Sequence, residues 1–334
     1  MSKLTINEIA KMANVSKGTV SKAMNGQKGV SEENRQRILS LVKDVNYRPN
    51  AIARALAQNK TGLIGIVLPH SVSTSLMENY WIEIITSVTE EIEKKGNNLI
   101  VIAPSSQKED PYESLRNIIL RRAVDGLIMG AENLNPDLME LIISSGIPFI
   151  FIGQNPKYPH FAIDVNNKEG AYLVTKELIN HLDNKPKNIC CITGPEEYIY
   201  TSERVKGFLK AVKEEKIESF IISHTDYSKE SLEKSILQIL ERYPDPDAFF
   251  IAAGGDFFLS IMDFLRLEGI NIKKKVVGVF DDSRIFDYLD FPIIAAKQPL
   301  KEIGEITAKN LFDLMIEKQP YKTVEYLPVK IILR

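Results

Sequence analysis

Side chains that can bind DNA gather between residues 16 and 22. Lys17 and Lys22 can donate hydrogen bonds to guanine O6 and N7 or to phosphate oxygens. Short hydroxyl donors that suit phosphate oxygens stand at Ser16, Thr19 and Ser21. Gly18 has no side chain, so either it permits a close approach of the helix backbone to the DNA or it contacts no base. The segment predicts a surface for a polyanion.

The charge of the chain supports a polyanionic partner at one end only. Residues 1–60 hold eleven Lys or Arg and four Asp or Glu, whereas the whole chain of 334 residues has a net charge of −2. A basic segment on an acidic body is typical of a nucleic-acid-binding module. A solvated basic tail is the simpler alternative, but tails lack the regular apolar spacing and helix caps found here.

Three short helices should position these donors. Thr5 and Glu8 form a capping box for the first helix, and Ser16 can cap a second helix over 17–24 that Asn25-Gly26 ends. Ser31 begins a third helix with an apolar set at Ile38, Leu41, Val42 and Val45.

Only Asn14 and Val15 separate the first two helices, so these must cross steeply, as in a helix-turn-helix. Such a unit presents its second helix to the major groove. A three-helix bundle that binds protein is the alternative that shape alone leaves open.

Residues 49–60 form a hinge after this head. Pro49 disfavours helix at Arg48, and Ala51 to Gln58 has strong helix formers but is too short to hold a helix alone in water. We therefore expect this segment to become ordered only with a partner. Taken by itself, it reads as a linker with helical tendency.

From residue 61 onward, apolar runs that favour strands alternate with amphipathic helical patterns. The strand-like runs are 63–68, 98–103, 126–130, 148–153, 188–193, 220–224, 248–253, 276–280 and 293–298. Helical patterns between them include 81–95, 112–123, 171–182, 204–215, 231–243 and 304–318. Such alternation predicts α/β architecture, with doubly wound parallel sheets covered on both faces.

Ten or so such units are too many for one small sheet, so we expect two lobes. The predicted domains are a head over 1–48, a hinge over 49–60 and a two-lobed core over 61–334. Lobe 1 is expected at about 61–161 and 292–322, and lobe 2 at about 162–291 and 323–334. Ligands in such folds bind beyond the carboxyl ends of the strands.

Enzyme signatures are missing from the sequence, so we expect no catalysis and no cofactor. It holds no G-x-G-x-x-G after a strand, no phosphate-binding P-loop and no H-E-x-x-H. The four histidines have no metal-ligand spacing, and the adjacent Cys190 and Cys191 are read as small buried apolar residues. Without a signal peptide or a long apolar stretch, a cytoplasmic protein is expected.

The opening of the chain resembles the lactose-repressor (LacI/GalR) family of bacterial regulators. The resemblance lies in TINEIAKMANVSKGTVSKAMNG and VSEENRQRILSLVKDVNYRPNAIARALAQNKTGLIGIVLP, which cover the head, the hinge and the first strand. It implies that paired hinges fold on the operator and that Leu56 wedges into the minor groove. The expected DNA contacts are Thr5, Ser16, Lys17, Gly18, Thr19, Ser21, Lys22, Asn25, Tyr47, Asn50, Ala53, Arg54 and Leu56.

The core continues the resemblance with a periplasmic-binding-protein-like fold. Gly194-Pro195, followed by Ser202 to Phe208, is similar to the family's G-P…S-x-x-R-x-x-G-F, which implies that Arg204 binds effector hydroxyls or a carboxylate. A lobe-surface salt bridge is the alternative for Arg204. The expected effector contacts are Tyr80, Trp81, Gln154, Arg204, Tyr227, Asp256 and Asp281.

Two departures from the family pattern remove expected ligand contacts. Ala253-Gly254-Gly255-Asp256 stands where the family has Ala-Asn-Asp, so a usual ligand-binding Asn is missing at Gly255. Gly153-Gln154 stands where Asp-Arg is common, which removes a typical hydroxyl acceptor. Fewer polar contacts at these positions could make room for a bulkier ligand than a standard monosaccharide.

The resemblance implies a sequence-specific transcription regulator, usually a repressor. It implies a homodimer, with a tetramer possible, on a pseudo-palindromic operator, and a sugar or related metabolite bound between the lobes as effector. A solute-binding protein of a transporter would use the same core, but residues 1–60 speak against it. An enzyme with an appended head is a further alternative, which turnover of sugars or nucleosides would reveal.

Overall fold

Contacts within the chain divide it into two compact units, Met1–Gly62 and Leu63–Arg334. The computed structural model describes residues 4–24, 26–45, 47, 60–70, 79–105, 107–130, 134–155, 157–158, 160–182, 188–317 and 324–334.

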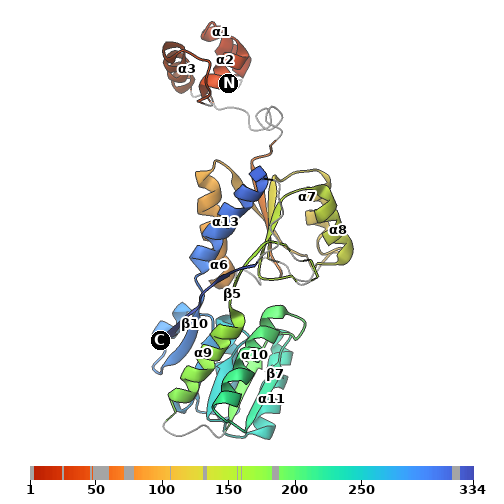
Figure 1. The fold of residues 1–334 in the computed structure, drawn as a ribbon, viewed down its shortest axis with the longest axis vertical. Helices are drawn as coiled ribbons and strands as arrows, with labels where there is room; N and C mark the ends of the chain where they lie inside the picture. The colour runs from red at the N-terminus through yellow and green to blue at the C-terminus, as the bar shows by residue number, and fades with distance from the viewer. Residues whose placement is uncertain are drawn as a thin grey trace. The chain divides into compact units, whose positions relative to one another are not determined.

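The head contains the three expected helices, α1 (Ile6–Met12), α2 (Lys17–Met24) and α3 (Glu32–Asp44) (Figure 1). The capping box of Thr5 and Glu8 is present, and Ser31 caps α3 by accepting a hydrogen bond from the Asn34 amide. Fully buried apolar side chains from all three helices form its core, namely Ile9, Val20 and Ile38. These observations confirm the predicted helical head.

The first sheet of the core is entirely parallel, in the order β11-β5-β4-β3-β1-β2. Its strands are β1 (Leu63–Val67), β2 (Asn98–Ile102), β3 (Gly126–Met129), β4 (Phe149–Ile152), β5 (Ala162–Val165) and β11 (Val324–Leu327). Helices α6 and α13 cover one face, and α7 and α8 cover the other (Figure 1). These helices are α6 (Asn79–Lys94), α7 (Glu113–Leu120), α8 (Pro136–Ser145) and α13 (Leu300–Glu317).

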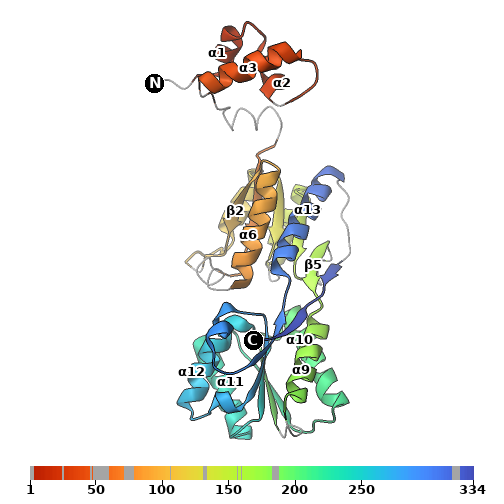
Figure 2. The ribbon, with the colours of Figure 1, turned by 90° about the vertical axis from the view of Figure 1, so that its left-hand side faces the viewer.

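The second sheet has the order β12-β10-β9-β8-β6-β7 and is parallel except for the edge strand β12. Its strands are β6 (Ile189–Thr193), β7 (Phe220–His224), β8 (Ala248–Ile251), β9 (Val276–Phe280), β10 (Ile293–Lys297) and β12 (Lys330–Leu333). Helices α9 and α10 cover one face, and α11 and α12 the other (Figure 2). These helices are α9 (Asn167–Asn180), α10 (Ile199–Glu214), α11 (Lys229–Arg242) and α12 (Phe258–Leu267). Short 3₁₀ turns are η1 (Gly255–Phe257), η2 (Ile272–Lys274) and η3 (Arg284–Tyr288).

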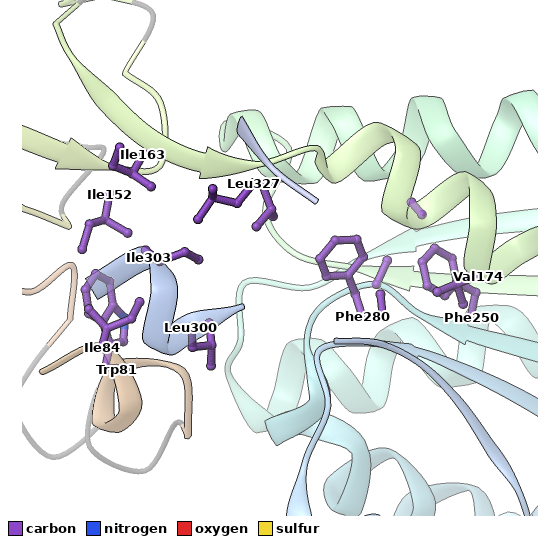
Figure 3. Packing of buried hydrophobic residues seen from close by; sticks show 14 of the residues in the cluster. Trp81, Ile84, Ile152, Ile163, Val174, Phe250, Phe280, Leu300, Ile303 and Leu327 are labelled. Atoms are coloured by element: carbon purple, nitrogen blue, oxygen red, sulfur yellow. The ribbon is translucent and has the colours of Figure 1, made fainter. Parts of the chain in front are cut away.

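Buried apolar side chains fill both lobes up to the region between them. Trp81 and Ile84 of α6 lie near Ile303 in the first lobe, and Phe280 lies near Phe250 in the second (Figure 3). Cys190 and Cys191 are fully buried in β6, as expected, and burial raises the pKa of the Cys190 thiol to about 12. The nine expected strands and the division into two lobes are therefore confirmed.

The lobe boundaries predicted from the sequence need correction. β5 and β11 pair within the first sheet, whereas β10 belongs to the second. The chain crosses between lobes directly after each of these strands. The sequence predicted the crossings at residues 162, 292 and 323, before these strands instead of after them. The short strands β5 and β11 were not recognised, because they give little periodic signal.

Among the described residues, none of the helices combines the length and apolar character that a membrane span requires.

Candidate functional site

A cavity of about 130 Å³ lies where the strand ends of the two lobes face each other. The first lobe contributes Pro69, His70, Tyr80, Trp81, Gly130, Ile152 and Asp164. The second contributes Asn167, Tyr198, Tyr200, Arg204, Tyr227, Ala253, Gly254, Phe257 and Asp281, and Gln298 lies on the crossover after β10. The expectation that loops after strands surround a cavity is therefore confirmed.

Arg204, on the first half of α10, is the central cation of this cavity and is only 6% exposed. Its Nε donates to Asn167 Oδ1 at 2.9 Å, and its Nη1 donates to the Ala252 carbonyl at 2.8 Å. The guanidinium also lies 3.7 Å from the ring centroid of Phe280. Its Nη2 donates no hydrogen bond to any described residue, which leaves donors for a ligand.

Two carboxylates, Asp164 and Asp281, lie on the cavity wall with Arg204. Both oxygens of Asp164 accept hydrogen bonds: Oδ1 accepts from the Val165 amide at 2.7 Å and from the Asn167 side chain at 3.2 Å, and Oδ2 accepts from the side chain of Gln154 at 2.9 Å. Asp281 accepts from the Gln298 amide through Oδ1, while its Oδ2 lies beside Gly254 and accepts from no described residue. Burial raises the pKa of both carboxyl groups, and Arg204 acts against that rise.

Asp281 has a backbone φ of 81°, the left-handed region, directly after β9. Asp and Asn tolerate this region better than most residues, and such strained positions often carry function. In the part of the chain that is described, no ion pair joins Asp281 or Asp164 to Arg204. The unused oxygen and the unused guanidinium nitrogen can therefore both serve a molecule placed between them.

Aromatic rings form the remaining walls of the cavity. Trp81 meets Tyr80 edge to face at 5.2 Å, and a Cβ built on Gly130 would lie 2.0 Å from the Trp81 ring. On the second lobe, the Tyr227 ring stacks on Phe257 at 4.7 Å. Flat faces of this kind suit the apolar faces of rings such as sugars.

Five of the seven predicted effector contacts line the cavity, namely Tyr80, Trp81, Arg204, Tyr227 and Asp281. Gln154 is not among the lining residues and instead holds Asp164 in place. Asp256 lies in η1, and its side chain is outside the described part of the structure.

Several lining residues were not predicted from the sequence, among them Asp164, Asn167, Tyr198, Tyr200, Phe257 and Gln298. A carboxylate inside the otherwise apolar run FAIDV was the available signal for Asp164.

The head presents the exposed side of α2, since Val20 and Ala23 are buried while Lys17, Gly18 and Lys22 are exposed. Ser16 caps α2 by accepting from the Thr19 amide at 3.1 Å, and the hydroxyls of Ser16 and Thr19 lie 2.8 Å apart. These two hydroxyls thus already support the helix that carries the lysines. Ser21 is half-buried beside them.

The remaining predicted DNA contacts have different surroundings. Thr5 caps α1, and half-buried Tyr47 packs against the apolar core of the head. The predictions for Asn25, Asn50, Ala53, Arg54 and Leu56 fall outside the described residues.

Arg35 is an internal support of the head. Its guanidinium donates to the carbonyls of Ala23 at 3.1 Å and Gln27 at 2.6 Å, at the end of α2. The charge of the head suggests that Arg35 neutralises a phosphate. Its guanidinium would then have to give up part of these two contacts.

Comparison with known families matches both units. Residues 5–50 match the family described as bacterial regulatory proteins, lacI family. Residues 61–321 match the family described as periplasmic binding proteins and sugar binding domain of LacI family.

Similar proteins extend over nearly the whole chain. Catabolite control protein A of Priestia megaterium is 27% identical over 99% of this chain and 98% of its own length. The HTH-type transcriptional regulator CelR of Thermobifida fusca is 25% identical over 98% of this chain and 95% of its own length. The lac repressor dimer bound to operator and an anti-inducer shares the fold, with a TM-score of 0.82, 21% identity and coverage of 99% and 98%. The chain belongs to the LacI family of bacterial transcriptional regulators.

Proposed function

We propose that this regulator holds a neutral, hydroxyl-rich molecule, a sugar or sugar derivative, in the cavity between its lobes, and that this molecule controls operator binding. The observation that carries the proposal is the pair of unused groups on the cavity wall, Arg204 Nη2 and Asp281 Oδ2. One is a charged donor and the other a charged acceptor.

A molecule with several hydroxyls offers both the acceptor and the donor that these two groups can use. One hydroxyl donates to Asp281 Oδ2, and another accepts from Arg204 Nη2. Hydrogen bonds to charged partners are stronger than neutral ones, about 1.5–3 kcal/mol each. The rings of Trp81 and Tyr227 then cover the apolar faces of the bound ring.

Operator recognition is assigned to the exposed side of α2 in a homodimer. Lys17, Gly18 and Lys22 are exposed on that helix, which suits the major groove. A two-fold dimer pairs naturally with a pseudo-palindromic site, and the lac repressor, a protein of the same fold, is a dimer on its operator.

Ligand binding changes operator affinity through the first lobe, which is the lobe that follows the head in the chain. The molecule contacts both lobes, so it favours the lobe arrangement for which its affinity is higher. The head is joined to this core directly before β1. A coupling free energy of about 1–3 kcal/mol, typical of allosteric proteins, would change operator affinity roughly 5- to 150-fold.

Asp281→Asn tests the proposal with little risk to the fold. Asn tolerates the left-handed backbone as Asp does, and its oxygen can still accept from Gln298. The amide nitrogen replaces the free acceptor, so we expect ligand affinity to fall at least about tenfold. Operator affinity without ligand should stay unchanged.

The measurement is a band shift with the full chain and its operator, titrated with sugars. Asp282→Asn is not a suitable control, because Asp282 pairs with Arg334. Asp137→Asn, at the exposed start of α8, serves instead. An unchanged sugar response in Asp281→Asn would remove the basis of this assignment.

A solute-binding protein of a transporter accounts only for residues 61–321. This alternative does not explain why residues 5–50 match bacterial regulatory proteins.

A further inference from the structure

Each of the two carboxylates on the cavity wall is held by the side-chain amide of a glutamine. Gln154 Nε2 donates to Asp164 Oδ2 at 2.9 Å, and Gln298 donates to Asp281 Oδ1. Asp281 keeps a second oxygen that accepts from no described residue, whereas both oxygens of Asp164 accept hydrogen bonds from the protein. Asp164 is therefore equipped to support neighbouring side chains, and Asp281 to contact a ligand.

The loop after β4 brings Gln154 to Asp164. Gly153 has a backbone φ of 82°, in the left-handed region that favours glycine, and so turns the chain directly after the strand. Its amide donates to the Ile163 carbonyl at 2.9 Å, which ties this loop to β5, the strand that contains Asp164. The half-buried Gln154 side chain thus reaches the carboxylate from within the first lobe.

Hydrogen bonds continue from Asp164 into the second lobe. Asn167, at the start of α9, donates through Nδ2 to Asp164 Oδ1 at 3.2 Å and accepts through Oδ1 from Arg204 Nε at 2.9 Å. We call the resulting series of hydrogen bonds the amide chain; its members are Gln154, Asp164, Asn167 and Arg204. The last three are at most 9% exposed, so little water competes for these bonds.

The amide of Asn167 stands between two opposite charges. Among the described residues, Arg204 makes no direct ion pair with Asp164, although its charge acts against the rise that burial causes in the pKa of that carboxyl group. A direct pair would satisfy both charges but would also occupy nitrogens of the guanidinium. With the amide between them, the carboxylate stabilises the buried cation while Arg204 Nη2 remains available to a ligand.

We propose that Gln154, on the first lobe, is a positioning residue for Arg204 on the second. By donating to Asp164 it keeps this carboxylate beside Asn167 and away from the guanidinium. Without the glutamine donor, Asp164 Oδ2 would be a buried charged acceptor without a partner, and the nearby cation would attract it. Arg204 would then lose its free donor. This inference rests on the proposed ligand contact of Arg204, and it makes that contact depend on the first lobe.

Two ionisable side chains face Asp164 from other elements of the described structure. One is Arg204 of α10, and the other is Tyr326 of β11. Burial raises the pKa of Tyr326, the charges of Asp164 and Glu203 raise it further, and a hydrogen bond with the Gln154 side chain acts against the rise. A carboxyl group at position 154 would therefore lie between Asp164 and Tyr326. Two carboxyl groups that share a site titrate as a pair, with one pKa raised.

Gln154→Glu replaces the amide donor by a group that donates only when it is protonated. At low pH the pair of carboxyl groups keeps one proton, so the new side chain can donate to Asp164 as glutamine does. As the pH rises this proton is lost, and repulsion replaces the hydrogen bond. We expect the sugar affinity of the variant to match that of its control at about pH 4, the ordinary pKa of a carboxyl group, and to be at least about tenfold weaker at about pH 8.

Binding is followed by the fluorescence of Trp81, the single tryptophan of the chain, which lies on the cavity wall. The full-length protein is titrated with glucose, galactose, maltose and cellobiose at each pH. Gln238→Glu, on the exposed side of α11, is the matched control, because it adds the same charge and leaves the titration of Asp164 and Asp281 in place. Gln154→Met keeps the length of the side chain without a donor, so its loss of affinity should lack the recovery at low pH.

A measurement without ligand tests the same amide chain. The Arg204 Nε–H resonance, assigned by its disappearance in Arg204→Lys, reports the hydrogen bond to Asn167. We expect this resonance to shift with pH more in Gln154→Glu than in Gln238→Glu. Recovery of the resonance and of sugar affinity at low pH shows that the Gln154→Glu variant is folded.

A ratio of variant to control affinity that is the same at every pH, or a Gln154→Met variant that binds as the unaltered chain does, would overturn the positioning role and leave sugar binding intact. If no sugar gives a saturable response, the proposed function fails and the Arg204 resonance decides alone. A resonance that Gln154→Glu does not affect would then overturn this inference as well.

Discussion

The close approach of the Trp81 ring to Gly130 determines where the indole lies on the cavity wall. A Cβ on residue 130 would lie 2.0 Å from Trp81 Cη2, which no side-chain pair tolerates. Glycine is therefore required here for packing, since the Trp81 ring fills the space that a side chain would need. The tryptophan in turn narrows the space left to a ligand.

We expect Gly130→Ala to push the Trp81 ring away from β3. Overpacking of this kind costs about 1–3 kcal/mol of unfolding free energy. The shift of the indole should change the emission maximum of the sole tryptophan and reduce sugar affinity. Gly18→Ala is the control, because a Cβ there meets nothing nearer than 3.6 Å. A Gly130→Ala variant with unaltered emission and stability would contradict this packing.

Burial of Asp164 gives the stability of the core a pH dependence of known sign. Its raised pKa means that the folded chain binds this proton more tightly than the unfolded chain. The stabilising contribution is present at low pH and is lost as the pH rises through the raised pKa. Asp164→Asn keeps an oxygen for the Val165 amide but cannot titrate.

As the pH rises above about 4, the ordinary pKa of an aspartate, the unfolding free energy of Asp164→Asn should therefore fall less than that of the unaltered chain. Urea denaturation over a series of pH values that starts there measures the difference. Asp137→Asn, at the exposed start of α8, is the control. The same reduction of the pH dependence of unfolding in both variants would show that Asp164 does not cause that dependence.

Helix α2 carries the exposed lysines that we propose to contact DNA, and contacts from α3 hold its end in place. Lys22 is exposed at the last turn of α2, whereas Arg35 of α3 donates to carbonyls at its end. Removing the charge of Lys22 should therefore have other consequences than removing the charge of Arg35, although both residues are cations of the same small head.

Lys22→Ala should lower operator affinity and reduce the slope of log affinity against log salt by about one, because one phosphate contact is lost. Arg35→Ala should instead lower the melting temperature of the head. The two variants are compared by band shifts at several salt concentrations and by thermal denaturation. Equal salt slopes for Lys22→Ala and the unaltered chain would exclude the phosphate contact.

The sequence predicted elements with strong local signals. Caps at Thr5, Ser16 and Ser31 located the helices of the head, and long apolar runs located nine strands of the core. β5, β11 and β12 escaped, because strands of four residues with polar side chains carry little periodicity.

The candidate site was predicted only in part for a similar reason. Arg204 and Asp281 follow recognisable patterns, but Asp164, Asn167 and Gln298 meet them only through the crossovers between lobes. Residues more than one hundred positions apart come together there, and nothing in local spacing signals such a meeting.

Three of the exposed apolar side chains of the core are Val101 on β2, Ile82 on α6 and Leu259 on α12. The elements β2, α6 and α12 lie toward the same side of the core in Figure 2. β2 is also an edge strand of its sheet. We propose that this side forms the two-fold interface of the homodimer.

Val101→Lys should therefore convert the dimer to a monomer, since it places two like charges in an apolar interface. Sedimentation or light scattering gives the mass. Leu120→Lys, at the end of α7 on the opposite face of the sheet, should remain dimeric. A dimer that persists in Val101→Lys would place the interface elsewhere.

The position of β11 and β12 in the sequence sets the order in which the protein can mature during translation. Residues 324–333 supply an edge strand to each of the two sheets, so the two lobes are not both complete until the ribosome has translated residue 333. The head has its full apolar core by residue 47. A nascent chain would thus carry a finished DNA-reading module well before the part that governs it exists.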